Sequence, residues 1–377
     1  MIHHTGTVII RGHIIALITT PAQENYLAQA AGVARFAYNW ALAAWNDIYT
    51  LHKLDPDVPN TSEMELRRGL NAIKKQSFPW MLEVTKCAPQ IAIQNLGNAF
   101  KNFFEGSAGY PKFKVKGRND RFTIINDHFV VKEKQIRLPH IGWISMRERL
   151  RFSGKILSAT VSKVAGKWYV SIAVEVDDLK LKPAKNQGKV GIDLGINTLA
   201  TLWKDDGTFE KTETLRPLKE YLPKLRKLSR SLSRKVKSSG GWKKAQLKLA
   251  RLHARIANIR KDRTHKLTNM ISSTYSAVVI EDLDVKGMMR GSSRGFNRAV
   301  SDMAFYEFRR QLEYKMEARG GELIIADRYF PSSKTCSHCK DIFRGLKREQ
   351  TSWTCAVCKT HHDRDVNGAH NLWTVTT

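Results

Sequence analysis

Two short apolar runs in the second half of the chain each end in a carboxylate, and they constrain the fold more than any other feature. One run is Val190-Gly-Ile, which ends at Asp193, and the other is Val278-Val-Ile, which ends at Glu281. Short apolar runs of this kind predict buried strands. A carboxylate at the end of a buried strand points out of the core, so we expect Asp193 and Glu281 to face a crevice.

A third acid, Asp365, follows a cluster of four cysteines, in the run Asp363-Arg-Asp-Val-Asn-Gly-Ala. Three carboxylates that meet in one place need cations, because like charges otherwise raise one another's pKa. Oxygen ligands suit Mg²⁺, and paired Mg²⁺ ions suit phosphodiester cleavage. We interpret Asp193 as the ligand shared by two Mg²⁺ ions, with Glu281 and Asp365 completing the two shells.

Neighbouring charged residues leave alternatives open. Asp363 competes with Asp365 as third ligand, and we favour Asp365 because the Asp-x-Asn turn into the last helix fixes its direction. We expect Asp282 and Asp284 to be flanking residues. A further hypothesis is that Arg328 or Arg364 stabilises the charge that develops on the phosphate in the transition state.

The four clustered cysteines form two Cys-x-x-Cys pairs. They are Cys336 with Cys339 and Cys355 with Cys358, and 15 residues separate the pairs. Two such pairs close a tetrahedral shell around one Zn²⁺ ion, and four sulfur ligands leave no open position, which indicates a structural site. The nearby histidines, His338, His361 and His362, are expected at the surface or on phosphates. The fifth cysteine, Cys87, is expected to be a small buried residue.

The net charge of the chain is +28, from 63 Lys and Arg residues against 35 Asp and Glu residues. A charge of this size indicates a polyanionic partner, and nucleic acid is the first candidate. No apolar run approaches the roughly 20 residues of a transmembrane helix, and the N-terminal segment lacks a secretory apolar region. We therefore expect no membrane association and a cytoplasmic location, near the nucleoid of a bacterium or archaeon.

Basic residues concentrate in two segments. From Arg216 to Lys266 there are 18 Lys and Arg residues and two acids, with apolar residues at helical spacing on both sides of a Ser-Ser-Gly-Gly break. This pattern predicts a basic helical hairpin over residues 216–270 that contacts phosphates. In the other segment, Lys112, Lys114 and Lys116 share one face if that segment is a strand. The candidate nucleic-acid contacts are Lys112, Lys114, Lys116, Arg118, Arg121, Lys243, Lys244, Arg251 and Arg255.

Periodicity predicts a helical block inside a β-rich first half. Residues 1–20 are typical of a strand, residues 22–105 of helices, and the β pattern returns in five segments, at 121–131, 134–138, 142–146, 156–164 and 167–176. Ser62 with Glu65 three residues later predicts a capped helix start. Further along, the Gly- and Ser-rich segment 287–299 predicts a flexible loop, and residues 301–319 predict one helix.

The chain resembles the TnpB family, transposon-associated RNA-guided DNA endonucleases related to type V CRISPR effectors. The resemblance covers most of the length and rests on motifs in both halves of the chain. These motifs are Phe36-Ala-Tyr-Asn39-Trp40, Gln94-Asn-Leu-Gly-Asn-Ala-Phe100, Tyr110-Pro-Lys-Phe-Lys114, Gly191-Ile-Asp193-Leu-Gly195, Glu281-Asp-Leu283, Phe330-Pro-Ser-Ser-Lys-Thr-Cys336-Ser-His-Cys339 and Asp363-Arg-Asp365-Val-Asn367.

This resemblance implies a multidomain α+β fold. A wedge β-barrel would comprise residues 1–20 and 106–180, with a helical recognition lobe inserted at 21–105 and a linker at 181–187. An RNase H-like RuvC nuclease domain would comprise residues 188–330 and 360–377, with a zinc ribbon inserted at 331–359. The resemblance also implies a guide RNA transcribed beside the gene and double-stranded DNA cut next to a short adjacent motif. We expect one protein chain in the ribonucleoprotein.

Three other functions are compatible with parts of this pattern. A nuclease-inactive, RNA-guided DNA-binding repressor should have lost one or more of the acids, whereas this chain keeps all three. An RNase H-like transposase that joins DNA ends fits the triad but not the order of helical lobe and zinc ribbon. A structure-selective resolvase should prefer four-way junctions without any RNA.

Overall fold

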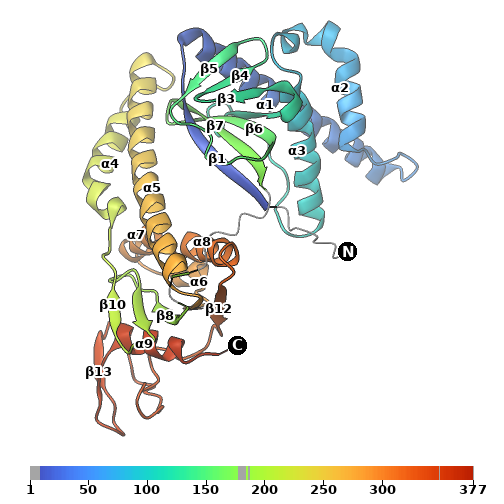
Figure 1. The fold of residues 1–377 in the computed structure, drawn as a ribbon. Coiled ribbons are helices and arrows are strands. Elements are labelled where there is room, and N and C mark those ends of the chain that lie inside the picture. Colours follow the sequence, from blue (N-terminus) through green and yellow to red (C-terminus); the bar gives the residue numbers. More distant parts are fainter. Residues whose placement is uncertain (1–8, 177–183, 186, 348, 377) are drawn as a thin grey trace, which may run out of the picture. The chain divides into compact units, whose positions relative to one another are not determined.

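The computed structural model describes residues 9–176, 184–185, 187–347 and 349–376. The chain divides into two compact units, Met1–Asp178 and Leu179–Thr377 (Figure 1). Most of the linker expected at 181–187 lies outside the described residues, as do the first eight residues of the expected N-terminal strand. No helix in the part of the chain that the structure describes is long and apolar enough to cross a membrane.

The first unit begins with a strand and continues with three helices. Strand β1 is Ile9–Ile18, and the helices are α1 (Pro21–Leu54), α2 (Glu63–Ser77) and α3 (Cys87–Phe104). Helix α2 begins where the sequence predicts, because the Ser62 hydroxyl accepts from the Glu65 N–H while the Glu65 carboxylate accepts from the Ser62 N–H. Cys87 is buried in the first turn of α3, as expected.

Seven antiparallel strands follow the order β2-β6-β7-β1-β5-β4-β3. Strand β1 joins the two halves of this sheet, since residues 9–16 pair with β7 and residues 17–18 pair with β5. The six strands that follow the helices are β2 (Arg121–Ile125), β3 (Val130–Lys132), β4 (Gln135–Leu138), β5 (Gly142–Met146), β6 (Lys155–Val164) and β7 (Lys167–Val176). The continuous strand expected at 121–131 is wrong, because a 3₁₀ turn at Asn126–His128 separates β2 from β3.

Helices and sheet of the first unit share one apolar core. Leu27 of α1, Leu96 and Phe100 of α3, and Ile124 of β2 are all almost fully buried in the same cluster. The three helices, which lie between β1 and β2 in the sequence, therefore pack on the sheet that contains these strands.

The second unit contains a five-stranded sheet in the order β10-β9-β8-β11-β12. Strands β8 (Lys189–Asp193), β9 (Thr201–Lys204) and β10 (Phe209–Lys211) form an antiparallel meander. Strands β11 (Ala277–Glu281) and β12 (Glu322–Ala326) run parallel to β8. Because Ile192 pairs with Ile280, the last residues of β8 and β11, Asp193 and Glu281, come to the same edge of the sheet.

Helices α4 (Pro217–Ser233) and α5 (Gly240–Thr274) form the hairpin that the sequence predicts (Figure 1). Leu225 of α4 packs against Leu252 and Ile256 of α5 in a narrow apolar seam. The fully buried Asp302 fixes the start of the hairpin, since its carboxylate accepts from the Leu218 N–H and from the Arg260 guanidinium.

The flexible loop expected at 287–299 is wrong, whereas the helix expected at 301–319 is present but starts later, at Phe305. The structure has three helices here, α6 (Val285–Met289), α7 (Arg294–Met303) and α8 (Phe305–Glu317). The Ser293 hydroxyl caps α7 by accepting from the Phe296 N–H, and Ala304, in the left-handed conformation (φ 57°), separates α7 from α8. Serine in this segment thus starts a helix instead of breaking one.

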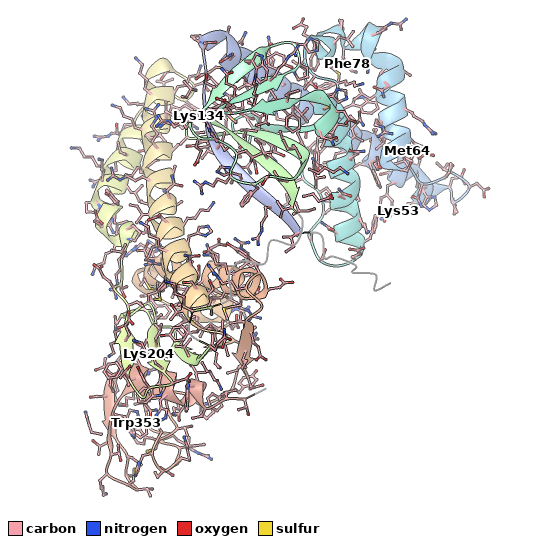
Figure 2. The ribbon with its side chains drawn as sticks, viewed as in Figure 1. Lys53, Met64, Phe78, Lys134, Lys204 and Trp353 are labelled. Atoms are coloured by element: carbon pink, nitrogen blue, oxygen red, sulfur yellow. The ribbon has the colours of Figure 1, made fainter. Side chains whose placement is uncertain are left out.

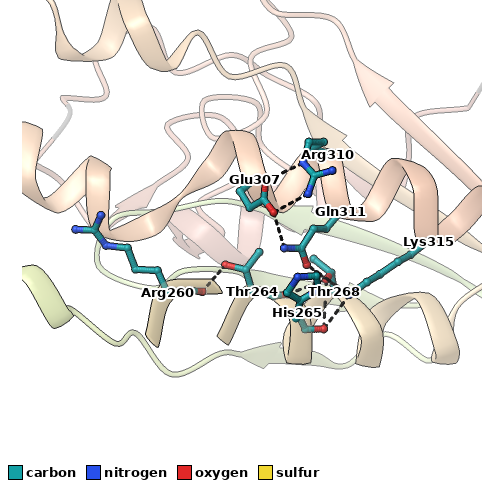
Figure 3. Close-up of polar contacts among 8 residues, drawn as sticks. All are labelled: Arg260, Thr264, His265, Thr268, Glu307, Arg310, Gln311 and Lys315. Atoms are coloured by element: carbon teal, nitrogen blue, oxygen red, sulfur yellow. Dashed lines mark hydrogen bonds and ion pairs between the residues drawn. The ribbon is translucent and has the colours of Figure 1, made fainter. Parts of the chain in front are cut away.

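A polar network holds α8 against α5 (Figure 3). The Lys315 ammonium donates to the Thr268 hydroxyl (2.7 Å) and to the His265 carbonyl (2.9 Å). The Gln311 amide nitrogen donates to Glu307 (2.9 Å), and the Gln311 oxygen lies 2.9 Å from the Thr268 hydroxyl. Gln311 is fully buried and Lys315 is 9% exposed, so each polar atom needs a partner inside this contact.

The chain ends in a small hairpin and a helix. Strands β13 (Ser352–Thr354) and β14 (His361–Asp363) pair beside the four cysteines, and Trp353, labelled in Figure 2, is buried among them. Helix α9 (Arg364–Trp373) then packs on β8. The approach is close, because a Cβ atom at Gly191 would lie 2.3 Å from the Ala369 carbonyl oxygen.

Candidate active site and metal cluster

Asp193, Glu281 and Asp365 meet beside the edge of the five-stranded sheet. Asp193 and Glu281 end the adjacent strands β8 and β11, and Asp365 lies in the first turn of α9. Helix α9 covers Asp193 closely, since a Cβ atom at Gly368 would lie 3.1 Å from Asp193 Oδ1. The structure therefore brings together the three acids that the sequence singled out.

Burial and mutual repulsion both act on these carboxyl groups. The pKa of Asp193 is raised well above its ordinary value, first by burial and then by the charges of Glu281 and Asp365. Burial also raises the pKa of Glu281, against the hydrogen bond that the Ser332 hydroxyl donates to it. The pKa of Asp365 is raised by burial and by the neighbouring charge of Asp363. Bound cations would relieve these costs, so the donor set fits a divalent ion with oxygen ligands.

Asp363, the alternative third ligand, has a different set of contacts. Its carboxylate caps α9 by accepting from the N–H groups of Asp365 (3.1 Å) and Val366 (3.0 Å). It also accepts from the Lys211 ammonium at 2.7 Å. Burial raises the pKa of Asp363, but these bonds outweigh burial and lower it overall. Asp363 is thus occupied in positioning the helix that carries Asp365.

The loop from Pro331 to Cys336 connects the acids to the cysteine cluster. Two buried asparagines of α9 hold its backbone, since Asn371 Nδ2 donates to the carbonyls of Ser332 (2.8 Å) and Thr335 (2.6 Å), and Asn367 Nδ2 also donates to Thr335 (2.8 Å). Asn367 belongs to the Asp-x-Asn pattern that favoured Asp365, but nothing local in the sequence predicts that Asn367 and Asn371 hold this loop.

The four clustered cysteines can hold one metal ion. Their Sγ atoms all lie within 4.8 Å of one another, with 3.5 Å between Cys336 and Cys358 and 3.6 Å between Cys339 and Cys355. A tetrahedral Zn²⁺ with Zn–S bonds of about 2.3 Å needs sulfur atoms about 3.8 Å apart, so the cluster fits zinc. Cys336 and Cys355 are fully buried, which suits a structural ion.

His362 departs from the expectation for the three nearby histidines. It is only 6% exposed, and its Nε2 atom lies 3.1 Å from Cys336 Sγ. The prediction that His362 is a surface residue is therefore wrong, because its ring packs beside Trp353 inside the cluster. His338 and His361 are exposed.

The flanking acids and Arg328 form a charged rim next to Glu281. Asp282 accepts from Arg309 (2.7 Å) and from Arg328 (2.6 Å), and Asp284 caps α6 by accepting from the Gly287 N–H. A cavity of about 560 Å³ lies beside Glu281 and is lined by Arg309 and Arg328 among others. Burial raises the pKa of Asp193 and Glu281, and the positive charge of Arg364, the other arginine considered for charge stabilisation, partly opposes that rise.

Four of the five basic residues near the end of α3 line one cavity of the first unit. The cavity has a volume of about 330 Å³ and includes Lys112, Lys114, Arg118 and Arg121, whereas Lys116 is exposed elsewhere. The segment is not a strand, so the condition under which Lys112, Lys114 and Lys116 would share one face is not met.

Contacts with α1 replace strand pairing in this segment. The Asn39 side chain donates to the Lys114 carbonyl (2.9 Å) and accepts from the Lys114 N–H (2.8 Å), which fixes an irregular backbone. The Lys114 ammonium lies 3.5 Å from the centre of the Tyr38 ring, and burial, helped by Arg121, lowers its pKa to about 8. Lys114 is thus less available to a phosphate than its exposed neighbours.

The basic residues of the hairpin have the exposure expected of nucleic-acid contacts. Lys243, Lys244, Arg251 and Arg255 all lie exposed on α5. Their apolar neighbours face α4, and the Arg255 guanidinium also lies 5.2 Å from the centre of the Tyr221 ring of α4.

Comparison with known proteins identifies the family. A protein of Escherichia coli (strain K12) with the name "Putative RNA-guided DNA endonuclease InsQ" is 34% identical over 365 residues, which cover 93% of this chain and 88% of the relative. The chain belongs to the TnpB family. A "Putative RNA-guided DNA endonuclease" of Streptomyces pristinaespiralis is another TnpB relative, 34% identical over 94% of this chain and 86% of its own length. The resemblance found in the sequence is thereby confirmed.

Three family models match parts of the TnpB chain. They are "Probable transposase" at residues 170–291, "Cas12f1-like, TNB domain" at 305–372 and "Helix-turn-helix domain" at 9–53. In this structure residues 9–53 form β1 and most of the single long helix α1, so the matched segment has no turn between two helices.

The fold of this TnpB chain is similar to that of the protein in a solved structure, "Cryo-EM structure of the Cas12f1-sgRNA-target DNA complex". The TM-score is 0.56 and the sequence identity 15%, over 93% of this chain and 82% of the other. The multidomain, mixed α and β fold class expected from the sequence is confirmed.

Proposed function

We propose that this chain is an RNA-guided, Mg²⁺-dependent DNA endonuclease of a transposable element, which cuts double-stranded DNA next to a short adjacent motif. The observation that carries the proposal is the meeting of Asp193, Glu281 and Asp365 at one sheet edge. The relatives support it, because proteins 34% identical over nearly the whole chain are named as RNA-guided DNA endonucleases.

In the proposed site, the carboxylates of Asp193, Glu281 and Asp365 would hold two Mg²⁺ ions, with Asp193 as the shared ligand. The ions, when bound, would supply an activated water and stabilise the leaving oxygen. Asp365 takes this role in preference to Asp363, whose carboxylate is occupied by the helix cap and by Lys211. Asp193 is 7% exposed, so ions bound to it would lie in a site from which bulk water is largely excluded.

The second unit, in this proposal, contains an RNase H-like RuvC domain at residues 188–330 and 360–377. The order β10-β9-β8-β11-β12, with one antiparallel meander and two parallel strands, supports it. Residues 331–359 are the zinc ribbon. In the first unit, the antiparallel sheet is the wedge barrel, and residues 21–105 are the recognition lobe.

The proposed partners are a guide RNA transcribed near the gene and a target DNA duplex, with one protein chain in the complex. Base pairing would read the target, while protein contacts hold the heteroduplex backbone. The exposed cations of α5 and those around Lys112 are the proposed backbone contacts. We place this activity in the cytoplasm, beside the nucleoid.

The test begins with expression of the protein together with the DNA that flanks its gene, followed by sequencing of the RNA that co-purifies. The expected result is one abundant RNA that maps beside the gene, and Mg²⁺-dependent cleavage of duplex DNA matching its guide. Asp193→Ala should keep RNA binding and lose cleavage by about 1,000-fold or more. Only mixed cellular RNA, removed by moderate salt, together with RNA-independent cutting of four-way junctions, would favour a resolvase.

A further inference from the structure

We propose that Ser332 is a positioning residue: its hydroxyl group holds Glu281 in place relative to Asp193 and Asp365. The inference rests on the proposed function, because it concerns the same metal-binding acids. It assigns a role to a hydroxyl group in the loop between β12 and the cysteine cluster.

The first observation is the contact itself. The Ser332 hydroxyl donates a hydrogen bond to Oε1 of Glu281, from a loop that lies 51 residues further along the chain. Ser332 is only 4% exposed, so water does not readily replace this donor. One carboxylate oxygen of Glu281 is thereby held by the protein, and no residue that the structure describes donates a hydrogen bond to the other, which could bind an ion.

The second observation is that Ser332 is itself fixed by the helix that carries Asp365. Its carbonyl oxygen accepts from Asn371 Nδ2 at 2.8 Å and from Asn367 Nδ2 at 3.4 Å. Both asparagines are almost fully buried on α9. One residue therefore contacts β11 through its hydroxyl group and α9 through its backbone, and it links the two elements that carry Glu281 and Asp365.

The physical consequence concerns the orientation of the Glu281 carboxylate. A glutamate side chain has three rotatable bonds, and the repulsion that acts between Asp193 and Glu281 favours rotamers that point away from the site. A buried donor on one oxygen opposes that rotation and favours the ionised form. Partners of this kind orient metal ligands, and their loss typically costs about 10- to 100-fold in metal affinity or activity.

The test compares Ser332→Ala with the full-length wild-type protein in its RNA complex. Isothermal titration with Mg²⁺, without DNA, should show about 10- to 100-fold weaker binding. Cleavage should need correspondingly more Mg²⁺, while the DNA concentration for half-maximal rate stays unchanged. Ser332→Thr, which keeps the hydroxyl donor, should recover most of the Mg²⁺ affinity.

The matched control is Thr335→Val in the same loop. The Thr335 hydroxyl donates to the Pro331 carbonyl and not to an acid, and valine has a similar shape. This variant should keep wild-type Mg²⁺ affinity. Zinc content and thermal unfolding, measured for every variant, report on the loop itself.

The outcomes separate the two levels of the proposal. Wild-type Mg²⁺ affinity and Mg²⁺ dependence in Ser332→Ala, with Asp193→Ala inactive, would overturn the role of Ser332 alone. Equal losses in Ser332→Ala and Thr335→Val would also overturn it, because any loosening of the loop would then suffice. Cleavage by Asp193→Ala at the wild-type rate would instead overturn the proposed function, and the role of Ser332 with it.

Discussion

Two glycines allow α9 to lie directly on the strand that carries Asp193. At Gly191 an added Cβ atom would lie 2.4 Å from the Trp373 backbone nitrogen, and at Gly368 it would lie 3.1 Å from the Asp193 carboxylate. Neither position has a positive φ, so the need for glycine comes from close packing and not from a turn. The spacing of the acids thus depends on two residues that carry no side chain.

Gly368→Ala should therefore reduce cleavage more than it reduces stability. The new methyl group forces the Asp193 carboxylate or α9 to move by a few tenths of an ångström, and misplacement of about 1 Å can cost about 100-fold in rate. We expect about a 10-fold loss of cleavage rate at saturating Mg²⁺. The control is Gly240→Ala, where nothing lies within 4 Å of the added atom. Equal rates for both variants would contradict this account.

The loop from Pro331 to Cys336 makes the metal cluster and the acids one structural element. It contributes the hydroxyl on Glu281, the carbonyls that bind Asn367 and Asn371, and the first cysteine of the cluster. On the other side, β14 leads from the cluster to the cap of α9 at Asp363. Loss of a metal ion held by the four cysteines would therefore loosen both ends of the segment that holds Asp365.

Cys336→Ser should lower the zinc content of the purified protein and inactivate the nuclease. Structural zinc contributes folding free energy directly, so the thermal unfolding midpoint of the second unit should fall. Hydrogen exchange should rise in α9 and in the loop that precedes Cys336. The measurements are zinc content, calorimetry and cleavage rate. Full activity and unchanged stability in a metal-free variant would refute a structural zinc site.

The contact between α5 and α8 depends on a buried ammonium group. Burial lowers the pKa of Lys315 to about 8, and no carboxylate pairs with it directly among the hydrogen bonds in Figure 3. The unfolded chain thus binds more protons at this site between pH 8 and the ordinary lysine value near 10.5. The free energy of unfolding therefore increases as the pH rises from about 8 towards 10.5. This contribution is lost again as the pH falls back to about 8.

Lys315→Met should remove this pH dependence. Between pH 8 and pH 10, the free energy of unfolding of the wild type should rise relative to that of the variant by about 1–3 kcal/mol. Urea unfolding at several pH values measures the difference. Lys248→Met, which removes an exposed lysine of α5, controls for the loss of one cation. A constant difference across this pH range would show that Lys315 does not titrate as described.

The chain has many more basic than acidic residues. Because 63 Lys and Arg residues stand against 35 Asp and Glu residues, many cations have no acid to pair with inside the protein and can bind a polyanion. The α4–α5 hairpin concentrates them on a surface that apolar packing keeps rigid. Phosphate contacts of this kind supply affinity without sequence preference.

Replacement of Lys243, Lys244, Arg251 and Arg255 by glutamine should weaken RNA binding at all salt concentrations. The logarithm of the RNA-binding constant decreases with the logarithm of the salt concentration. If all four side chains contact phosphates, the magnitude of this slope should decrease by about 3, at about 0.7 for each single-stranded contact. Stability should change little, because all four side chains are exposed. Filter binding between 50 and 300 mM salt measures the slope, and an unchanged slope would exclude this surface.

Patterns local in sequence predicted much of this molecule. Strand endings located Asp193 and Glu281, Cys-x-x-Cys spacing located the cluster of four cysteines, and the Ser62 capping box located a helix start. Predictions failed where tertiary contacts decide the backbone. Asn39 holds Lys114 in an irregular segment, and Ser293 caps a helix inside a Gly-rich stretch. Nothing near His362 in the sequence predicts that its ring is buried against Cys336.

The packing of α9 on β8 also has a consequence during translation. Asp193 and Glu281 leave the ribosome well before Asp365, which is 172 positions after Asp193. At about 5–20 residues per second, that interval lasts roughly ten to thirty seconds. Throughout it, Gly191 and the Asp193 carboxylate lack the helix that later covers them. A nascent chain can thus display its basic hairpin to nucleic acid while it still lacks the third acid, so we infer that binding competence precedes cutting competence.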